Sequence, residues 1–138
     1  MEHLRAQESI DELVARFFSV FDNRCGTKPW LASLIDCFAE KATVVRRSGA
    51  DTELMTVSEF AVPRIELLTQ GALLAFHEWE ISSTTQVFDG IATRISRYGK
   101  AGLLNGSAYG GSGTKCFHLV SLGSGWRITS LAWVDDNA

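Results

Sequence analysis

The C-terminal stretch from Thr114 to Val134 constrains the fold more than any other part of the chain. It reads as two long strands that fold back on each other over Gly123-Ser124-Gly125. An earlier strand pair is joined at Asp89-Gly90, a dipeptide typical of type I′ hairpin turns because both central residues need a positive φ. Residues 99–113 between the two pairs hold six glycines, which predicts a flexible connection or a pair of bulged strand ends.

Three N-terminal segments have helical spacing of their apolar residues. The first is Ile10 to Phe21, in which apolar side chains recur three and four residues apart. The second follows Pro29, a residue suited to a first helical turn. The third begins at Thr56 and Glu59, which have capping-box spacing, and contains Pro63, which we expect to kink or split it. Helices followed by an antiparallel meander indicate an α+β protein.

The register of the first hairpin assigns its side chains to two faces of the sheet. If Phe88 lies opposite Ile91, then Thr85 lies opposite Arg94 and Ile81 opposite Tyr98. Both resulting faces mix apolar and charged groups, so we expect helices and a cavity to cover one and a partner subunit the other. The first set includes Glu78, Glu80, Ile91, Ile95 and Arg97, and the second includes His77, Trp79, Ile81, Val87, Arg94 and Tyr98.

Composition excludes several classes of function. The 138 residues fit a single domain, 1–138, and the net charge of −3 without a basic stripe argues against binding to nucleic acid. No run of eighteen apolar residues predicts a membrane span, and no signal peptide is expected. Three cysteines without metal-ligand spacing predict neither a disulfide framework nor a metal site, which fits a reduced cytoplasmic protein without a cofactor.

Three stretches resemble the nuclear transport factor 2-like superfamily, and within it the SnoaL-like proteins, which include polyketide cyclases. They are Leu34 to Val44, Gly90 to Tyr98, and Gly125 to Trp133, so the resemblance covers nearly the whole chain. It implies a cone-shaped α+β fold, with about three helical segments packed in a curved mixed or antiparallel sheet and an apolar pocket between them. It also implies a homodimer formed through the outer sheet face.

The steroid isomerases of this superfamily provide a test of one reaction. The resemblance places their catalytic tyrosine at Phe17, their base aspartate near Arg46, and their protonated aspartic acid near His118. A phenylalanine donates no hydrogen bond and an arginine cannot act as a base. Steroid isomerisation by that mechanism is therefore not expected.

His118, Glu80 and Arg97 are the candidate catalytic residues. His118 lies in mid-strand, where it could act as an acid or base in the pocket, or be a satisfied core or interface histidine. Its cross-strand neighbour is Ser130 for a three-residue loop and Leu131 for a four-residue loop. Glu80 with Arg97 could form a carboxylate site of raised pKa, although an exposed ion pair is the more common outcome.

A second set of residues could bind the ligand rather than react with it. These candidates are Phe17, Phe21, Trp30, Arg46, Glu78 and Cys116. Two hypotheses follow. In the first, the cone binds a small, largely apolar organic ligand, with proton transfer of the lyase, isomerase or cyclase type if the protein is an enzyme. In the second, the protein is a non-catalytic dimeric binding or accessory module.

Overall fold

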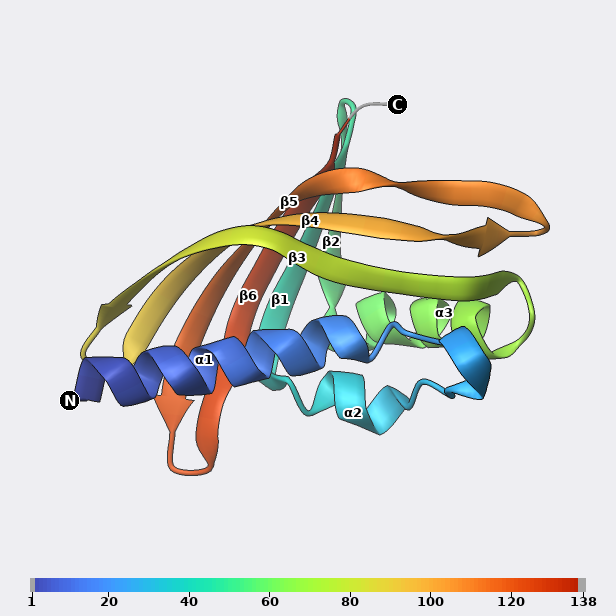
Figure 1. Cartoon of the computed structure of the whole chain (residues 1–138). Coiled ribbons are helices and arrows are strands. Elements are labelled where there is room, and N and C mark those ends of the chain that lie inside the picture. Colours follow the sequence, from blue (N-terminus) through green and yellow to red (C-terminus); the bar gives the residue numbers. More distant parts are fainter. Residues whose placement is uncertain (1, 137–138) are drawn as a thin grey trace.

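The computed structural model describes residues 2–136, which form the predicted α+β fold (Figure 1); the strand Asp51–Thr56 before the third helix was not predicted. Its helical elements are α1 (Glu2–Ser19), the 3₁₀ turn η1 (Arg24–Gly26), α2 (Leu31–Ile35) and α3 (Val57–Thr69). Its strands are β1 (Phe38–Ser48), β2 (Asp51–Thr56), β3 (Leu73–Phe88), β4 (Ile91–Leu104), β5 (Ser107–Leu122) and β6 (Gly125–Asp135). No helix in this part of the chain is long and apolar enough to cross a membrane.

The six strands form one strongly curved mixed sheet in the order β2-β1-β6-β5-β4-β3. Only the β1–β6 pair is parallel, and all other neighbours are antiparallel. The helices lie on the concave side of this sheet, so the molecule has the predicted cone shape (Figure 1). The core occupies the space between α1, α3 and the concave sheet face.

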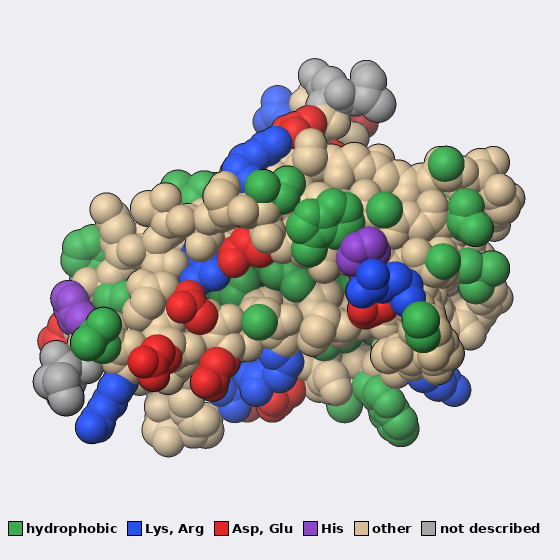
Figure 2. All heavy atoms as spheres, viewed as in Figure 1, with side chains coloured by type: hydrophobic (Ala, Val, Ile, Leu, Met, Phe, Trp, Pro, Cys, Tyr) green, Lys and Arg blue, Asp and Glu red, His purple; other side chains and the backbone are tan. Residues whose placement is uncertain are grey.

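Helix α1 packs through an aromatic face. Its apolar residues from Ile10 to Phe18 are buried, as the helical spacing predicts, while acidic side chains gather over its outer face (Figure 2). Phe17 is fully buried at the centre, in edge-to-face contact with Phe21 and Phe117 at centroid distances of 5.3 and 5.4 Å. These ring contacts pack α1 against the concave face of the sheet.

Helix α3 begins at the predicted capping box. Thr56 Oγ1 accepts a hydrogen bond from the Glu59 N–H, and the Glu59 carboxylate accepts one from the Thr56 N–H. Of the two effects expected of Pro63, a kink or a split, the split is wrong, because the helix continues through it to Thr69. Proline removes one backbone donor, and the burial of Phe60, Ile65 and Leu68 on either side of it holds the helix to the core.

The β3–β4 hairpin follows the predicted register only close to its turn. Asp89 and Gly90 both have positive φ, and Thr85 lies opposite Arg94 as expected. A bulge at Ile81 then shifts the pairing, so Tyr98 lies opposite Glu80 rather than Ile81. The predicted division between two faces is therefore wrong for the β3 residues before this bulge, whereas β4 keeps the predicted alternation. The bulge places Glu80 on the same face as Arg94 and Tyr98.

The glycine-rich stretch is regular structure rather than a flexible connection. It forms the ends of β4 and β5, joined by a tight turn at Asn105-Gly106. A Cβ at Gly113 would approach the Tyr98 hydroxyl to 2.6 Å and the Val134 carbonyl oxygen to 2.5 Å. Glycine is therefore needed here because neighbouring groups come too close for any side chain.

Candidate functional site

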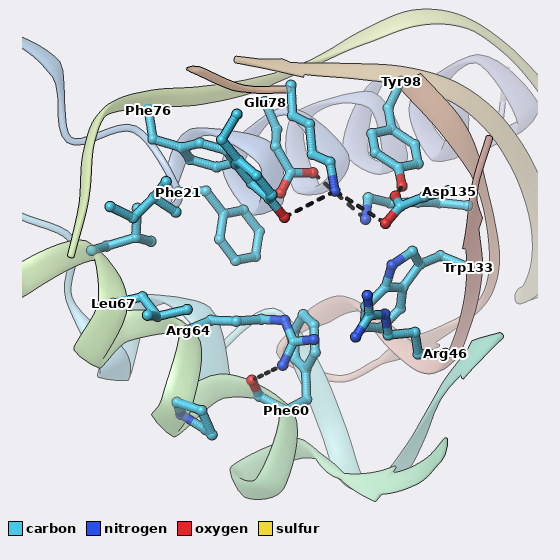
Figure 3. Close-up of a pocket in the computed structure, with 16 residues that line it drawn as sticks. Phe21, Arg46, Phe60, Arg64, Leu67, Phe76, Glu78, Tyr98, Trp133 and Asp135 are labelled. Carbon is cyan, nitrogen blue, oxygen red and sulfur yellow. Dashed lines mark hydrogen bonds and ion pairs between the residues drawn. The ribbon is translucent and has the colours of Figure 1, made fainter. Parts of the chain in front are cut away.

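A cavity of about 220 Å³ opens between α3 and the concave face of the sheet (Figure 3). Its walls come from Phe21 just after α1, from α3, and from every strand except β2. Leu67, 40% exposed, lies at its rim, whereas Tyr98 and Lys115 are buried in its wall. The remaining lining residues are Phe21, Arg46, Phe60, Pro63, Arg64, Leu68, Leu73, Phe76, Glu78, Lys100, Tyr109, Trp133 and Asp135.

One side of the cavity is aromatic and aliphatic. Phe60 and Trp133 meet edge to face at 5.4 Å, and Phe21 packs against Phe60 at 6.3 Å. Figure 3 shows these rings and Phe76 turned toward the same space. Rings of this kind bind flat or compact apolar molecules through contact area.

Lys115 is the most unusual group in the wall. It is only 4% exposed, and its Nζ lies 4.2 Å from the centroid of Tyr98 and 4.9 Å from that of Trp133. Its nearest carboxylate oxygen is Glu78 Oε1, at 3.6 Å. Burial lowers the pKa of Lys115 below 10.5, and the carboxylate of Glu78 only partly opposes that effect.

Glu78 extends from β3 toward this lysine. Its Oε1 is buried and has no hydrogen-bond partner among the described residues, because the distance to Lys115 is too long for a hydrogen bond. A buried carboxylate oxygen without a donor carries a desolvation cost. The pair therefore presents an unused acceptor beside a cation in the cavity wall.

Tyr98, Asp135 and Lys100 form a second polar group next to the first. The Tyr98 hydroxyl donates to Asp135 Oδ1, and Lys100 Nζ lies 3.1 Å from Asp135 Oδ2. Burial alone would raise the pKa of Asp135, but these hydrogen bonds and the charge of Lys100 outweigh it and hold the pKa below 3.8. Burial and the neighbouring carboxylate raise the pKa of Tyr98. Asp135 thus stays ionised and already has donors on both oxygens.

Two guanidinium groups complete the cavity. Arg64 stacks over Phe60 and Trp133, with its Cζ 4.7 and 5.0 Å from the ring centroids, and donates to the Phe60 carbonyl at 2.9 Å. Burial lowers the pKa of Arg64, and the nearby charge of Arg46 adds to this effect. Among the described residues neither guanidinium is in an ion pair with a carboxylate. The lining thus carries more positive than negative side chains.

The predicted catalytic residues do not converge. His118 is exposed on the outer face of the sheet, where its Nδ1 lies 3.1 Å from Ser130 Oγ. It cannot reach the cavity, because Lys115, Phe117 and Leu119 take the inward positions of β5. The expectation that His118 faces the pocket is therefore wrong. Ser130 is its cross-strand partner, which is the pairing expected for a three-residue loop. The turn between Leu122 and Gly125 is shorter than that loop, and a bulge next to His118 restores the pairing.

Glu80 and Arg97 are held by other residues. The Glu80 carboxylate accepts hydrogen bonds from Arg94 and from Ser96, at 2.6 and 2.5 Å. Arg97 lies on the opposite side of β4 and pairs with Asp136 at 2.6 Å. The predicted Glu80–Arg97 site is wrong because the bulge at Ile81 moves Glu80 to the other face.

The predicted ligand-binding residues separate into two groups. Phe21, Arg46 and Glu78 line the cavity, and their role as ligand contacts stays a prediction. Phe17 is buried in the core below it, Trp30 is 69% exposed, and Cys116 is exposed on the outer face; none of these three lines the cavity.

Several polar residues that meet in the cavity, among them Lys115 and Tyr98, were missed by sequence reasoning. Phe117 and Leu119 are apolar and lie two residues apart on β5, as inward-facing residues of a strand do. Continuing this spacing two residues toward the N-terminus would have placed Lys115 inward as well. Tyr98 follows the regular alternation of β4, in which Ala92, Arg94, Ser96 and Tyr98 all face inward, so its orientation depends on which face of that strand the core covers. Across residues 2–136, no cluster of three His, Cys, Asp or Glu side chains is arranged to hold a metal ion.

Comparison with known proteins shows the fold. No family model and no curated protein sequence matches the chain. A nuclear transport factor 2-like superfamily protein from Salmonella enterica serovar Typhimurium superposes with a TM-score of 0.79 at 12% identity, covering 99% of this chain and 94% of that one. The resemblance is structural, since identity at this level carries no information on activity.

Two further structures agree. A protein with a cystatin-like fold from Novosphingobium aromaticivorans has a TM-score of 0.74 at 16% identity, with 99% and 86% of the two chains covered. A type 2 hexachlorocyclohexane dehydrochlorinase has a TM-score of 0.77 at 12% identity, with 98% and 88% covered. The fold is therefore nuclear transport factor 2-like, as the sequence resemblance implied, and the SnoaL-like assignment within it stays a prediction.

Proposed function

We propose that this nuclear transport factor 2-like protein binds a small, largely apolar organic molecule in its cone cavity and transfers a proton to or from it. The observation that carries the proposal is the buried Lys115–Glu78 pair, which lies in the cavity wall beside the rings of Tyr98 and Trp133. Ligand sites typically combine an apolar surface with precisely placed polar groups, which set orientation and chemistry. A hexachlorocyclohexane dehydrochlorinase of the same fold, named for an apolar substrate, supports the proposal.

The two groups suit different halves of a proton transfer. Glu78 Oε1, an acceptor without a donor, would take a proton from carbon next to an electron-withdrawing group. Lys115, 3.6 Å away, would stabilise the negative charge that develops on the ligand. Both act inside a buried site, where such charge interactions are stronger than in water.

The test is hydrogen exchange at an acidic carbon. We would incubate the protein with 1-tetralone in D₂O and follow loss of the α-proton signal by NMR. Wild-type protein should accelerate the exchange, and Glu78→Gln should lower the rate by about a hundredfold. Glu8→Gln, an exposed carboxylate on α1, is the matched control and should have no effect. Equal rates for wild type and Glu78→Gln would refute proton transfer at this pair.

A non-catalytic binding module is the second candidate. It is favoured by the mutual neutralisation of Lys115 and Glu78 and by the saturated oxygens of Asp135, which together resemble a structural polar network. Binding of 1-tetralone measured by quenching of Trp133 fluorescence, without any exchange, would support this second function.

We also propose that the protein forms a homodimer through its outer sheet face. Ile81 and Ile95 are 57% and 53% exposed there, and Trp79 and Ile91 are exposed beside them. Apolar patches of this kind usually mark interaction surfaces. Sedimentation equilibrium should show a dimer that Ile95→Glu dissociates, whereas Leu54→Glu on edge strand β2 should leave it intact. A monomeric wild-type protein would contradict the proposal.

A further inference from the structure

Two lysines line the same cavity in contrasting surroundings. Lys100 donates to Asp135 and to the Tyr109 hydroxyl, at 3.1 and 3.3 Å, whereas Lys115 has no hydrogen bond among the described residues. The interactions of Lys100 with Tyr109 and Asp135 outweigh its burial and raise its pKa, whereas burial lowers the pKa of Lys115. One cavity therefore holds a stabilised ammonium group and a destabilised one.

The charged groups around Lys115 come from several elements. Glu78 on β3 and Asp135 on β6 favour its protonated form, while Lys100 on β4 and Arg64 on α3 oppose it. The aromatic rings that enclose its Nζ offer no hydrogen bond, although their faces attract a cation. A lysine that is desolvated and placed beside other cations is the usual environment of a nucleophilic amine.

We propose that Lys115 Nζ forms an imine with the carbonyl carbon of an aldehyde or ketone bound in the cavity. The nitrogen lone pair forms the C–N bond as the carbonyl π bond breaks, and a nitrogen proton moves to the oxygen to give a carbinolamine. Loss of that hydroxyl group as water leaves the C=N bond. The sum is amine plus carbonyl giving imine plus water, with no oxidant or reductant.

Glu78 is placed to move the protons of this sequence. Its Oε1 lies 3.6 Å from Nζ, so it can accept the proton of the ammonium group and deliver it to the departing hydroxyl. The inference rests on the proposed function in using the same cavity and the same acid–base group, and it names carbonyl compounds as the ligand class. The protonated imine would also withdraw electrons from the adjacent carbon more strongly than the ammonium group does.

The test is reductive trapping on the wild-type protein. We would add 2-naphthaldehyde at a limiting concentration with sodium cyanoborohydride, and locate the label by peptide mass spectrometry. Lys115 should be labelled at least about tenfold faster than the exposed Lys28 and Lys41. Mapping the wild type avoids dependence on a variant that fails to fold.

Two variants then distinguish labelling in the cavity from labelling at the surface. Lys115→Arg should remove the fast labelling, and Lys41→Arg should retain it. Labelling of Lys115 no faster than that of Lys28 overturns the inference. If 1-tetralone still exchanges its proton in that case, the proposed function stands alone. Fast labelling of Lys115 without proton exchange of 1-tetralone supports the imine and refutes proton transfer as the function. If neither fast labelling nor exchange occurs, both proposals are refuted.

Discussion

Replacing Lys115 and Glu78 separately and together measures whether they are a compensated buried pair. At 3.6 Å the two charges attract by about 5 kcal/mol with an effective dielectric constant of about 20. Burial of both side chains, 5% and 12% exposed, offsets most of that attraction. Lys115→Met or Glu78→Gln alone should therefore cost about 3 kcal/mol of unfolding free energy, since each leaves a buried group without its counter-charge.

The double variant gives the decisive comparison. Lys115→Met with Glu78→Gln removes both charges, so its stability should lie within about 1 kcal/mol of the wild type. Urea denaturation followed by circular dichroism measures all four proteins, and unchanged m-values show that their unfolded states are comparable. If the double variant loses the sum of the two single losses, the residues do not interact and the reasoning from the pair is wrong.

The same pair has a predicted pH signature. Burial lowers the pKa of Lys115 in the folded protein below 10.5, the value of an unfolded lysine. At pH values between the folded pKa and 10.5, the unfolded chain therefore binds more protons than the folded protein does. The stability of the wild type relative to Lys115→Met should therefore rise as the pH is increased toward about 10. A flat difference across this range, measured by urea denaturation, would show that the amine keeps its ordinary pKa in the folded protein.

Two further predictions concern the sheet. Arg94 is 4% exposed and pairs with acidic groups on two elements, so Arg94→Met should cost about 3 kcal/mol of unfolding free energy. Arg97→Met removes an exposed ion pair and should cost much less. Similar losses in urea denaturation would contradict the inward placement of Arg94. Gly113→Ala should cost about 2 kcal/mol because its Cβ would collide with the Tyr98 hydroxyl, whereas Gly123→Ala has open space. Equal melting temperatures for these two glycine variants would refute the close contact.

Features that depend on neighbouring residues could be predicted from the sequence. The aromatic face of α1, the capping box at Thr56 and the turn at Asp89-Gly90 follow from spacing and backbone preferences that act over a few residues. The succession of helices and then strands followed from the same patterns, and the resemblance added the cone shape. Pro63 shows the limit of local rules, since packing on both sides keeps the helix continuous.

The identity of the inward-facing residues was decided by tertiary structure. A strand changes which face its side chains take whenever one residue is inserted, and the bulge at Ile81 moved Glu80 away from Arg97 and toward Arg94. His118 was misplaced for a related reason, because the correct phase of β5 is set by burial of Phe117 in the core. The sequence thus determined the helices, the turns and the fold class, while long-range strand pairing selected Lys115 and Glu78 to face the cavity.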